Sequence, residues 1–167
     1  MSSGVKVCDE VKNVFNKMKV VKKEDAEEDR IRLVTCVIDE ENGEIRVEQC
    51  LQQKSEECKE DVFKCLQNLM PNDHCRYILY DCHFETEECC KKEELVFMLW
   101  TPDSASIKEK MQYASSKGAI DKVIEGVKHK MQMHDKADID KEEFAKCLTD
   151  KVKNLEGCSL RGSHAHK

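Results

Sequence analysis

Apolar residues at helical spacing predict four helices in this chain. Between Asp9 and Lys19, large apolar side chains recur every three or four positions, which is typical of an amphipathic helix with one buried face. The same spacing predicts helices over Lys59–Leu69 and over about Lys141–Lys153. Ser106 and Glu109 fit the capping box that opens a helix, so another helix is expected to begin at Ser106.

The helix that begins at Ser106 is predicted to consist of two segments separated by Gly118. Its first turns carry Met111 and Tyr113, and Gly118 marks a bend or a weak point after them. Beyond Gly118, one buried face is expected to continue through the apolar residues Ile120, Val123, Ile124, Val127 and Met131.

Runs of β-branched and aromatic residues predict strands that pair as hairpins. The predicted strands are, in order, Ile31–Ile38, Glu44–Cys50, Arg76–Phe84, Leu95–Trp100 and a short one at Ala137–Ile139. Asn42-Gly43 is a strong signal for a tight turn between the first two. Glu85–Glu94 is expected to be a polar hairpin loop between the next two.

Together these elements predict one mixed α/β (α+β) domain. Helices interleaved with hairpin strands favour a central mixed sheet of about five strands, flanked by helices on both faces. We expect this domain to span residues 1–161, followed by a disordered tail over residues 162–167.

Composition and charge narrow the class of protein. The chain has 167 residues, of which 28 are basic and 34 are acidic, and its net charge is −6. A general nucleic-acid binder would normally be basic, so no nucleic-acid partner is expected. The longest apolar run, Leu95–Trp100, is far too short to span a bilayer, and the first residues contain no apolar signal core.

The chain contains eleven cysteines, an odd and high count. Without a secretory signal, a disulfide framework is not expected, and we interpret the chain as a cytosolic protein with reduced thiols. The densest group is Cys75, Cys82, His83, Cys89 and Cys90, but its spacing does not match the paired ligands of structural zinc sites. No metal is therefore predicted, and most cysteines are expected to act as small buried hydrophobes.

Motifs of catalysis are absent from the sequence. It contains no phosphate-binding loop, no dinucleotide fingerprint, no nucleophile elbow and no metalloprotease motif. Asp138–Glu142 resembles the start of a calcium loop, but Glu143 replaces the required glycine and Thr149 replaces the final glutamate. These absences favour a binding module over an enzyme, with no cofactor.

One helical face suggests a binding surface. Lys108, Met111, Ser115 and Lys122 lie on roughly the same side if the helix is continuous. Methionine is common on protein-binding surfaces. The alternative is a solvated lysine face whose methionine turns inward, and spacing alone favours that alternative.

Several motifs, in a fixed order, resemble one known family. Residues 100–117 read WTPDSASIKEKMQYASSK and are very similar to the signature helix of the cofilin and actin-depolymerizing factor family. CRYILYD at 75–81 and KKEELVF at 91–97 match the same family, as do Ser3-Gly4-Val5 and the VFNKMK segment at 14–19. The resemblance covers most of the chain from Ser3 to about Leu160.

The resemblance implies a gelsolin-like, actin-depolymerizing factor homology fold and a non-catalytic function. Family members bind actin monomers and filament sides, prefer ADP-actin, sever filaments and depolymerise them. The monomer-binding residues that the resemblance implies are Ser3, Gly4, Val5, Lys108, Lys110, Met111, Ser116 and Lys122. The implied filament-binding residues are Lys91 and Lys92 in the hairpin loop and Asp150 and Lys151 in the last helix.

The resemblance also implies three kinds of regulation. A kinase and a phosphatase would act on Ser3, with Ser2 as a competing phosphoacceptor. Phosphoinositide head groups would compete with actin for a set of basic residues, Lys108, Lys110, Lys122, Lys128 and His129. His129 would also respond to pH through a pair with an acidic residue of the sheet, here Glu94.

The sequence departs from the family pattern in three places. The basic run that serves nuclear import in vertebrate cofilins is replaced by residues 27–32, EEDRIR, so a cytoplasmic, cytoskeletal protein is expected and nuclear import is doubtful. Asp121-Lys122-Val123 stands where three lysines are frequent, which predicts weaker binding of phosphoinositides and actin. Adjacent Cys89 and Cys90 precede Lys91, which predicts an oxidation site beside the filament-binding lysines. These thiols keep one alternative open: a metal- or redox-responsive protein on the same scaffold that does not sever filaments.

Overall fold

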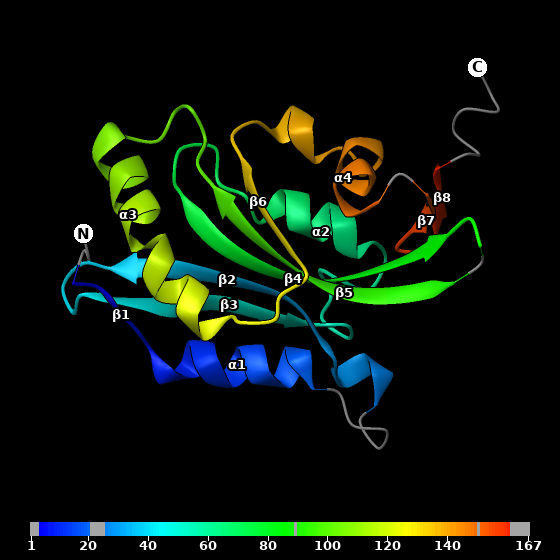
Figure 1. Ribbon diagram of the computed structural model, residues 1–167, viewed down its shortest axis with the longest axis horizontal. Helices are drawn as coiled ribbons and strands as arrows, with labels where there is room; N and C mark the ends of the chain where they lie inside the picture. The colour runs from blue at the N-terminus through cyan, green and yellow to red at the C-terminus, as the bar shows by residue number, and fades with distance from the viewer. Residues whose placement is uncertain (1–3, 21–25, 89, 150, 161–167) are drawn as a thin grey trace.

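A mixed β-sheet forms the middle layer of the protein, shown in a computed structural model that describes residues 4–20, 26–88, 90–149 and 151–160 (Figure 1). Its strand order is β1-β3-β2-β4-β5-β6, and β7 pairs with β4 and with β8. The strands are β1 (Lys6–Val7), β2 (Ile31–Asp39), β3 (Glu44–Gln52), β4 (Arg76–Thr86), β5 (Lys91–Trp100), β6 (His129–Met133), β7 (Val152–Leu155) and β8 (Cys158–Ser159). The pairs β1–β3 and β5–β6 are parallel and the other pairs are antiparallel, so the predicted mixed sheet is confirmed.

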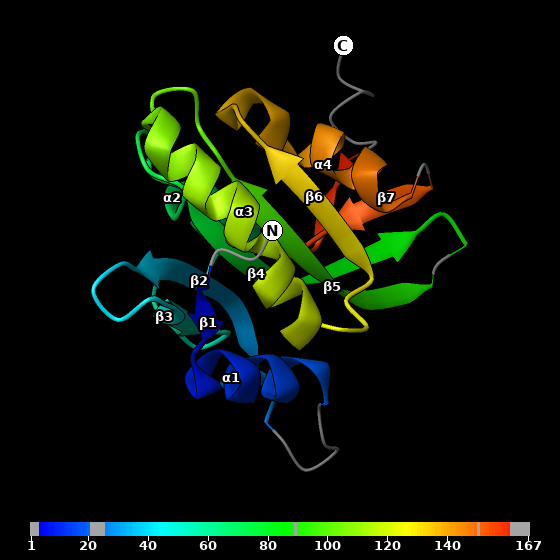
Figure 2. The same ribbon diagram turned by 60° about the vertical axis from the view of Figure 1, so that its left-hand side comes forward.

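Helices cover both faces of this sheet (Figure 2). The four helices are α1 (Asp9–Lys19), α2 (Val62–Asn68), α3 (Ile107–Val123) and α4 (Lys141–Leu148), with short 3-10 helices at Glu27–Asp29 and Lys136–Ile139. Buried side chains of α1 and α3 pack on one face, and those of α2 and α4 pack on the other. None of the helices in the described part of the chain is long and apolar enough to cross a membrane.

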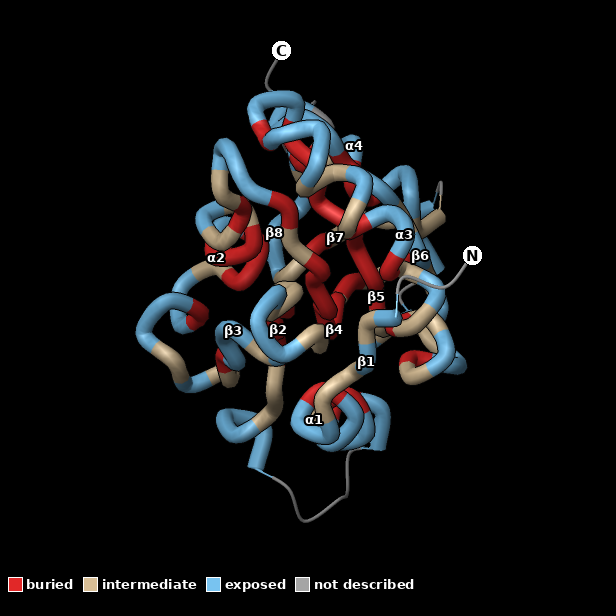
Figure 3. Tube along the Cα trace, turned by 90° about the vertical axis from the view of Figure 1, so that its left-hand side faces the viewer, coloured by how far each residue is buried: buried red, intermediate tan, exposed pale blue. Residues whose placement is uncertain are grey.

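The alternation of side chains along β4 separates two apolar cores. Tyr77 and Leu79 face α1 and α3, whereas Ile78 and Tyr80 face α2 and α4. A strand with both faces covered must be apolar at nearly every position, which is what the sequence of this strand shows. In Figure 3 the buried residues accordingly gather in the strands and on the inner sides of the helices.

The sheet has more strands than the sequence predicted. The additional strands are β1, β6, β7 and β8. Helix α3 continues through Gly118 but ends at Val123, and Gly126 then adopts a positive φ of 89°. Met131 therefore lies in β6, where it pairs with Met98, and the predicted extension of the helix to Met131 is wrong. The sequence of β6, HKMQM, also alternates between more buried and exposed side chains with the two-residue period of a strand. Pairing with β5 satisfies that period.

Two predictions near the C-terminus are also wrong. The strand expected at Ala137–Ile139 belongs to the 3-10 helix Lys136–Ile139. Helix α4 ends at Leu148 rather than Lys153, and Val152 instead begins β7. The expected disordered tail, residues 162–167, lies outside the described residues.

The hairpin between β4 and β5 is longer than predicted, and its loop is shorter. Glu85 pairs with Lys91 and Phe84 with Lys92, so both lysines belong to β5 and not to a loop.

Helix α2 begins at Val62 rather than Lys59, because the Asp61 carboxylate caps it by accepting from the Phe63 and Lys64 amides.

Candidate functional site

Two large apolar side chains are exposed one turn apart on α3. Ile107 is 76% exposed and Met111 is 66% exposed, and Lys108 and Ser115 are exposed on the same helix. We call Ile107, Lys108, Met111 and Ser115 the α3 surface. Exposed apolar side chains beside a cation are typical of a surface that another protein covers. Sequence analysis identified Met111 but missed Ile107.

The opposite side of α3 is fixed to the sheet by polar contacts as well as by packing. The Tyr113 hydroxyl accepts from the Ile38 amide at 3.1 Å, and the Tyr77 hydroxyl donates to the Tyr113 carbonyl at 2.5 Å. Ser106 caps the helix by accepting from the Glu109 amide, as predicted. The Glu109 carboxylate, however, accepts from the Cys75 amide, so only half of the predicted capping box forms. These contacts hold the α3 surface in one orientation.

The N-terminal segment lies beside α3. The Lys6 amide donates to the Gly43 carbonyl at 2.9 Å, which starts the parallel pairing of β1 with β3. Gly4 and Val5 consequently line an open hollow of about 340 Å³ together with Gln112, Ser115 and Ser116 of α3. The structure thus brings two of the predicted monomer-binding residues, Gly4 and Val5, next to the α3 surface. Ser3 lies outside the described residues.

The other predicted monomer-binding residues occupy different environments. Ser116 is only 1% exposed and is located on the buried side of α3, where it borders that hollow. Lys110 is half-buried, and its Nζ donates to the Asp103 carbonyl at 3.0 Å. Lys122 is exposed at the far end of the helix, about 21 Å from Lys108 at 1.5 Å per residue.

The predicted phosphoinositide-binding residues therefore form two groups. Lys108 and Lys110 lie at the start of α3, and Lys122, Lys128 and His129 lie beyond or near its end. Lys128 Nζ is 3.3 Å from a carboxylate oxygen of Glu94. One head group is too small to contact both groups, so any such binding would use them separately.

His129 and Glu94 form the predicted pair. β6 begins at His129, which pairs with Val96 of β5, and this register places the imidazole next to Glu94. His129 Nε2 lies 2.8 Å from Glu94 Oε1. Partial burial acts to raise the pKa of the Glu94 carboxyl, but hydrogen bonds from His129 and Lys128 outweigh it and hold this pKa below its ordinary value.

This pair predicts a pH response. Because the pKa of Glu94 is lowered on folding, its stabilising contribution is present above the unfolded carboxyl pKa of about 4.3 and is lost on acidification through the folded pKa. The resemblance predicts that filament disassembly rises with pH and that this pair is the sensor. We therefore expect His129→Ala to flatten the rise and His134→Ala, at an exposed histidine, to leave it intact. An unchanged pH profile of disassembly in His129→Ala would show that the pair is not the sensor.

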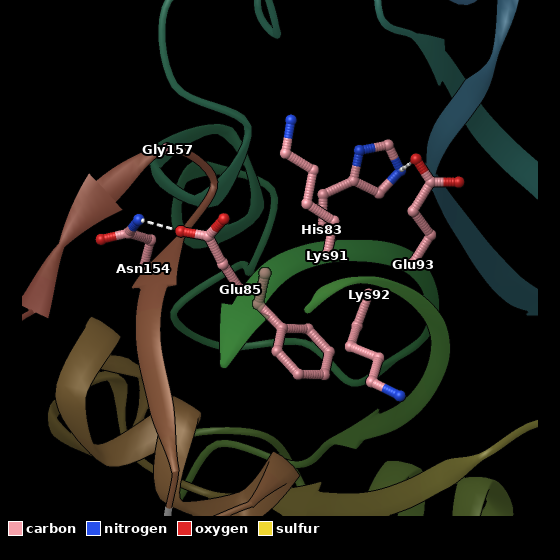
Figure 4. A pocket seen from close by; sticks show the side chains of 8 residues that line it. His83, Glu85, Lys91, Lys92, Glu93, Asn154 and Gly157 are labelled. Atoms are coloured by element: carbon pink, nitrogen blue, oxygen red, sulfur yellow. Dashed lines mark hydrogen bonds and ion pairs between the residues drawn. The ribbon is translucent and has the colours of Figure 1, made fainter. Parts of the chain in front are cut away.

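The predicted filament-binding lysines lie at the other end of the sheet. Lys91 and Lys92 leave β5 on opposite sides and border an open hollow of about 290 Å³, together with His83, Glu85 and Asn154 (Figure 4). The Glu87 amide donates to the Lys151 carbonyl at 2.9 Å, and Lys151 Nζ lies 3.5 Å from Glu88 Oε1.

Lys151 is thus next to the tip of the hairpin that carries Lys91 and Lys92, although it precedes β7 rather than lying in the last helix. The structure brings these three lysines to one end of the sheet. Asp150 lies outside the described residues. We call Lys91, Lys92 and Lys151 the hairpin surface.

A buried ionic network supports the hairpin surface, and sequence analysis missed it. Arg32 is 2% exposed, and its guanidinium donates to the Glu156 carboxylate and to the Asp81 carbonyl. Glu156 also accepts from the Tyr80 hydroxyl and from the His83 amide. Next to this network, Arg30 donates to Asp81 at 2.8 Å and to Glu93 at 2.6 Å.

The structure offers little support for a metal site. Among the described residues, Glu27, His83 and Glu93 are the group whose ligand atoms could converge on an ion. Arg30 already lies between the carboxylates, with Nη1 2.6 Å from Glu93 and 3.7 Å from Glu27, so a cation there would compete with its guanidinium. Cys75, which precedes β4, and Cys82, which lies in β4, are both buried and do not belong to this group.

Comparison with known proteins agrees with the fold. The family described as cofilin/tropomyosin-type actin-binding protein matches residues 4–149, which is most of the chain. The chain belongs to this family. It is therefore an actin-binding protein in the general sense of that family.

Solved structures of cofilins and depolymerizing factors are similar to the chain over most of its length. Cofilin from Streptomyces griseoflavus is 26% identical with a TM-score of 0.72, and 89% of this chain aligns with 99% of that chain. Actin depolymerization factor 2 from Plasmodium berghei is 27% identical with a TM-score of 0.71, over the same shares. Glia maturation factor from Caenorhabditis elegans is 20% identical with a TM-score of 0.59, over 87% of this chain and 99% of that chain. This similarity shows a shared fold alone.

Proposed function

We propose that this protein binds actin monomers through the α3 surface and filament sides through the α3 and hairpin surfaces together, and that it severs and depolymerises filaments. The observation that supports monomer binding best is the exposure of Ile107 and Met111 on a helix whose other side is fixed. Rigid apolar anchors lose little conformational entropy on binding, and a neighbouring lysine would steer the protein toward the acidic surface of actin. Severing follows if the bound state favours a filament geometry different from that of bare filaments.

The two surfaces can be tested separately because they lie at opposite ends of the sheet. Wild-type protein should bind monomers in a fluorescence titration and should co-sediment with filaments. Lys91→Ala/Lys92→Ala should weaken co-sedimentation and leave monomer affinity unchanged, since both lysines are distant from α3. Equal losses in the two assays would contradict a separate filament-binding surface, and absence of binding in both would contradict the proposal as a whole.

We further propose that phosphorylation of Ser3 switches binding off. The neighbouring Gly4 and Val5 lie beside the α3 surface, so a phosphate at residue 3 would add about −1.5 to −2 charges where acidic actin would dock. Ser3→Glu should depolymerise actin poorly, and Ser3→Ala should remain active. Ser2→Glu provides the matched comparison, since a larger effect at residue 2 would identify Ser2 as the sensitive position. Full activity of both glutamate variants in a filament disassembly assay would argue against a phosphate switch.

Phosphoinositides are proposed as competing ligands, acting mainly at the start of α3. Lys108 is exposed there, beside the anchors Ile107 and Met111. At the other end of α3, Asp121 lies 3.1 Å from Lys117 and 3.5 Å from Lys130 and partly neutralises the basic surface. Vesicles containing phosphoinositides should therefore compete with actin through Lys108 more than through Lys122. Lys108→Ala should weaken this competition more than Lys122→Ala, and equal effects of the two variants would contradict this assignment.

We also propose that the protein acts in the cytoplasm and cytoskeleton as a non-catalytic binding protein.

A further inference from the structure

Two buried thiols face each other at the start of α2. Cys58 is 1% exposed and Cys65 is 3% exposed, and their sulfur atoms lie 3.9 Å apart. Cys58 belongs to the segment that joins β3 to α2, where its amide donates to the Ser55 carbonyl at 2.9 Å, and Cys65 belongs to α2 itself. A disulfide has a sulfur–sulfur distance of about 2.05 Å, so these sulfurs need to approach by about 2 Å.

Three of the other described cysteines have neighbours of a different kind. Cys90 Sγ contacts the Glu88 carbonyl, Cys147 Sγ contacts the Glu143 carbonyl, and Cys158 Sγ lies 3.1 Å from Lys141 Nζ. Cys36 is buried, which raises the pKa of its thiol to about 12 and disfavours the reactive thiolate. Cys58 and Cys65, whose sulfur atoms lie 3.9 Å apart, are placed to react with each other.

Cys58 borders an open hollow although it is buried. An open hollow of about 340 Å³ is lined by Cys58 together with Arg32, Lys59, His83 and Glu156. Cys65 does not line this hollow and lies behind Cys58. A molecule the size of hydrogen peroxide would meet Cys58 first.

The environment divides the roles between the two thiols. The hydrogen bond between the two thiols lowers the pKa of the Cys58 thiol, and Arg32 adds to this effect, although burial opposes it. The pKa of the Cys65 thiol is raised by the same hydrogen bond and by burial. Cys58 is thus suited to attack as a thiolate, and Cys65 is suited to remain protonated until it resolves the product.

We propose that Cys58 and Cys65 form a redox-responsive dithiol that closes to an intramolecular disulfide when the protein meets a hydroperoxide such as hydrogen peroxide. In the first step the Cys58 sulfur attacks the peroxide O–O bond, which gives a sulfenic acid at Cys58 and one water. In the second step the Cys65 sulfur attacks the sulfenic sulfur, the S–S bond forms, and a second water leaves. Two thiols and one hydrogen peroxide thus yield one disulfide and two waters.

Closure of this disulfide would act on the hairpin surface rather than on the α3 surface. Cys58 shares its hollow with Arg32 and Glu156, and His83 and Gly157 line both this hollow and the one beside Lys91 and Lys92. A shift of the segment before α2 would therefore be transmitted to the network that supports the hairpin surface. This consequence rests on the proposed function, but disulfide formation does not.

Mass spectrometry tests the disulfide without any actin. The full-length protein is treated with hydrogen peroxide, free thiols are blocked with N-ethylmaleimide, and the protein is digested with trypsin without reduction. Cleavage after Lys54, Lys59, Lys64 and Arg76 yields peptides 55–59 and 65–76. They should appear joined, with a mass two hydrogens below the sum of peptide 55–59 and of peptide 65–76 carrying one maleimide on Cys75. Peptide 65–76 also contains Cys75, so fragmentation must place the bond at Cys65. Oxidation should raise the melting temperature by about 5 °C, because the cross-link restricts the unfolded chain, and dithiothreitol should reverse this rise.

Single variants separate the two roles. Cys65→Ser should let the Cys58 sulfenic acid accumulate, where dimedone traps it, and Cys58→Ser should leave Cys65 reduced. Cys90→Ser is the matched control at an exposed thiol and should leave the 58–65 bond unchanged. The proposal is overturned if Cys58 and Cys65 of the wild-type protein are still free to react with maleimide after treatment with peroxide at concentrations that oxidise Cys90. It is also overturned if Cys58 is found bonded to another chain. The wild-type peptide map decides this even if a serine variant fails to fold.

Discussion

Replacing Ile107 and Met111 together with aspartate should lower the affinity for actin monomers about 100-fold. Burying one such side chain in an interface contributes about 1.5–3 kcal/mol, and about 1.4 kcal/mol corresponds to a tenfold change in affinity. Both side chains are largely exposed in the isolated protein, so the same change should leave its melting temperature nearly unchanged. Fluorescence titration with monomeric actin and a thermal melt measure the two effects on the same preparation.

Val20→Asp provides a matched control for this double variant. Val20 is 62% exposed, comparable to Ile107 and Met111, but it follows α1 and lies away from the α3 surface. Its replacement should leave monomer affinity at the wild-type value. Equal losses in the control and in the double variant would mean that surface charge in general, and not the α3 surface, governs the interaction.

Removing the Glu156 carboxylate should cause the largest loss of stability of any change proposed here. Glu156→Ala leaves Arg32 charged and buried without its carboxylate, which costs about 3–5 kcal/mol in the free energy of unfolding. The Tyr80 hydroxyl and the His83 amide also lose their acceptor. Urea unfolding of the wild type and the variant measures this difference.

A double-mutant cycle shows whether the loss comes from the ion pair. Arg32→Met/Glu156→Ala removes both charges, so it should be more stable than the sum of the single losses implies. Lys54→Ala removes an exposed ion pair with Asp29 and should leave the unfolding curve in place. Strict additivity of Arg32→Met and Glu156→Ala would contradict a coupled buried pair.

Local sequence signals predicted the elements that depend on local interactions. The spacing of Val11, Phe15 and Met18 fixed the buried face of α1, and the Asn42-Gly43 turn lies between β2 and β3 as expected. Ser106 caps α3 because its hydroxyl needs only the nearby Glu109 amide. Such contacts span a few residues, so the sequence alone reveals them.

Long-range pairing could not be predicted in this way. β6 exists because β5 offers it a parallel partner about 30 residues earlier in the chain, and that partner outweighs the helical spacing of Met131. Arg32 occurs within a run of strand-forming residues, but its partner Glu156 is 124 residues away. No local pattern indicates which acid a buried arginine will meet.

The exposure of the candidate site residues was predicted in part, and the differences have physical explanations. Lys108 and Met111 are exposed as the binding interpretation requires, but exposed Ile107 cannot be distinguished from a core residue by its identity alone. Ser116 lies three residues after Tyr113 and four before Ile120, which is the spacing of the buried face. That spacing could have placed Ser116 inward, whereas the family resemblance placed it in the monomer-binding site.

We propose above that this protein uses the α3 surface to bind and break actin filaments. Fluorescent filaments immobilised in a flow cell test it most directly, because binding and breakage are seen on the same filament. We expect wild-type protein to decorate filaments and breaks to appear along their length, whereas Ile107→Asp/Met111→Asp should neither decorate nor break them. Filaments that stay intact and undecorated with wild-type protein, or that break equally with the double variant, would contradict it.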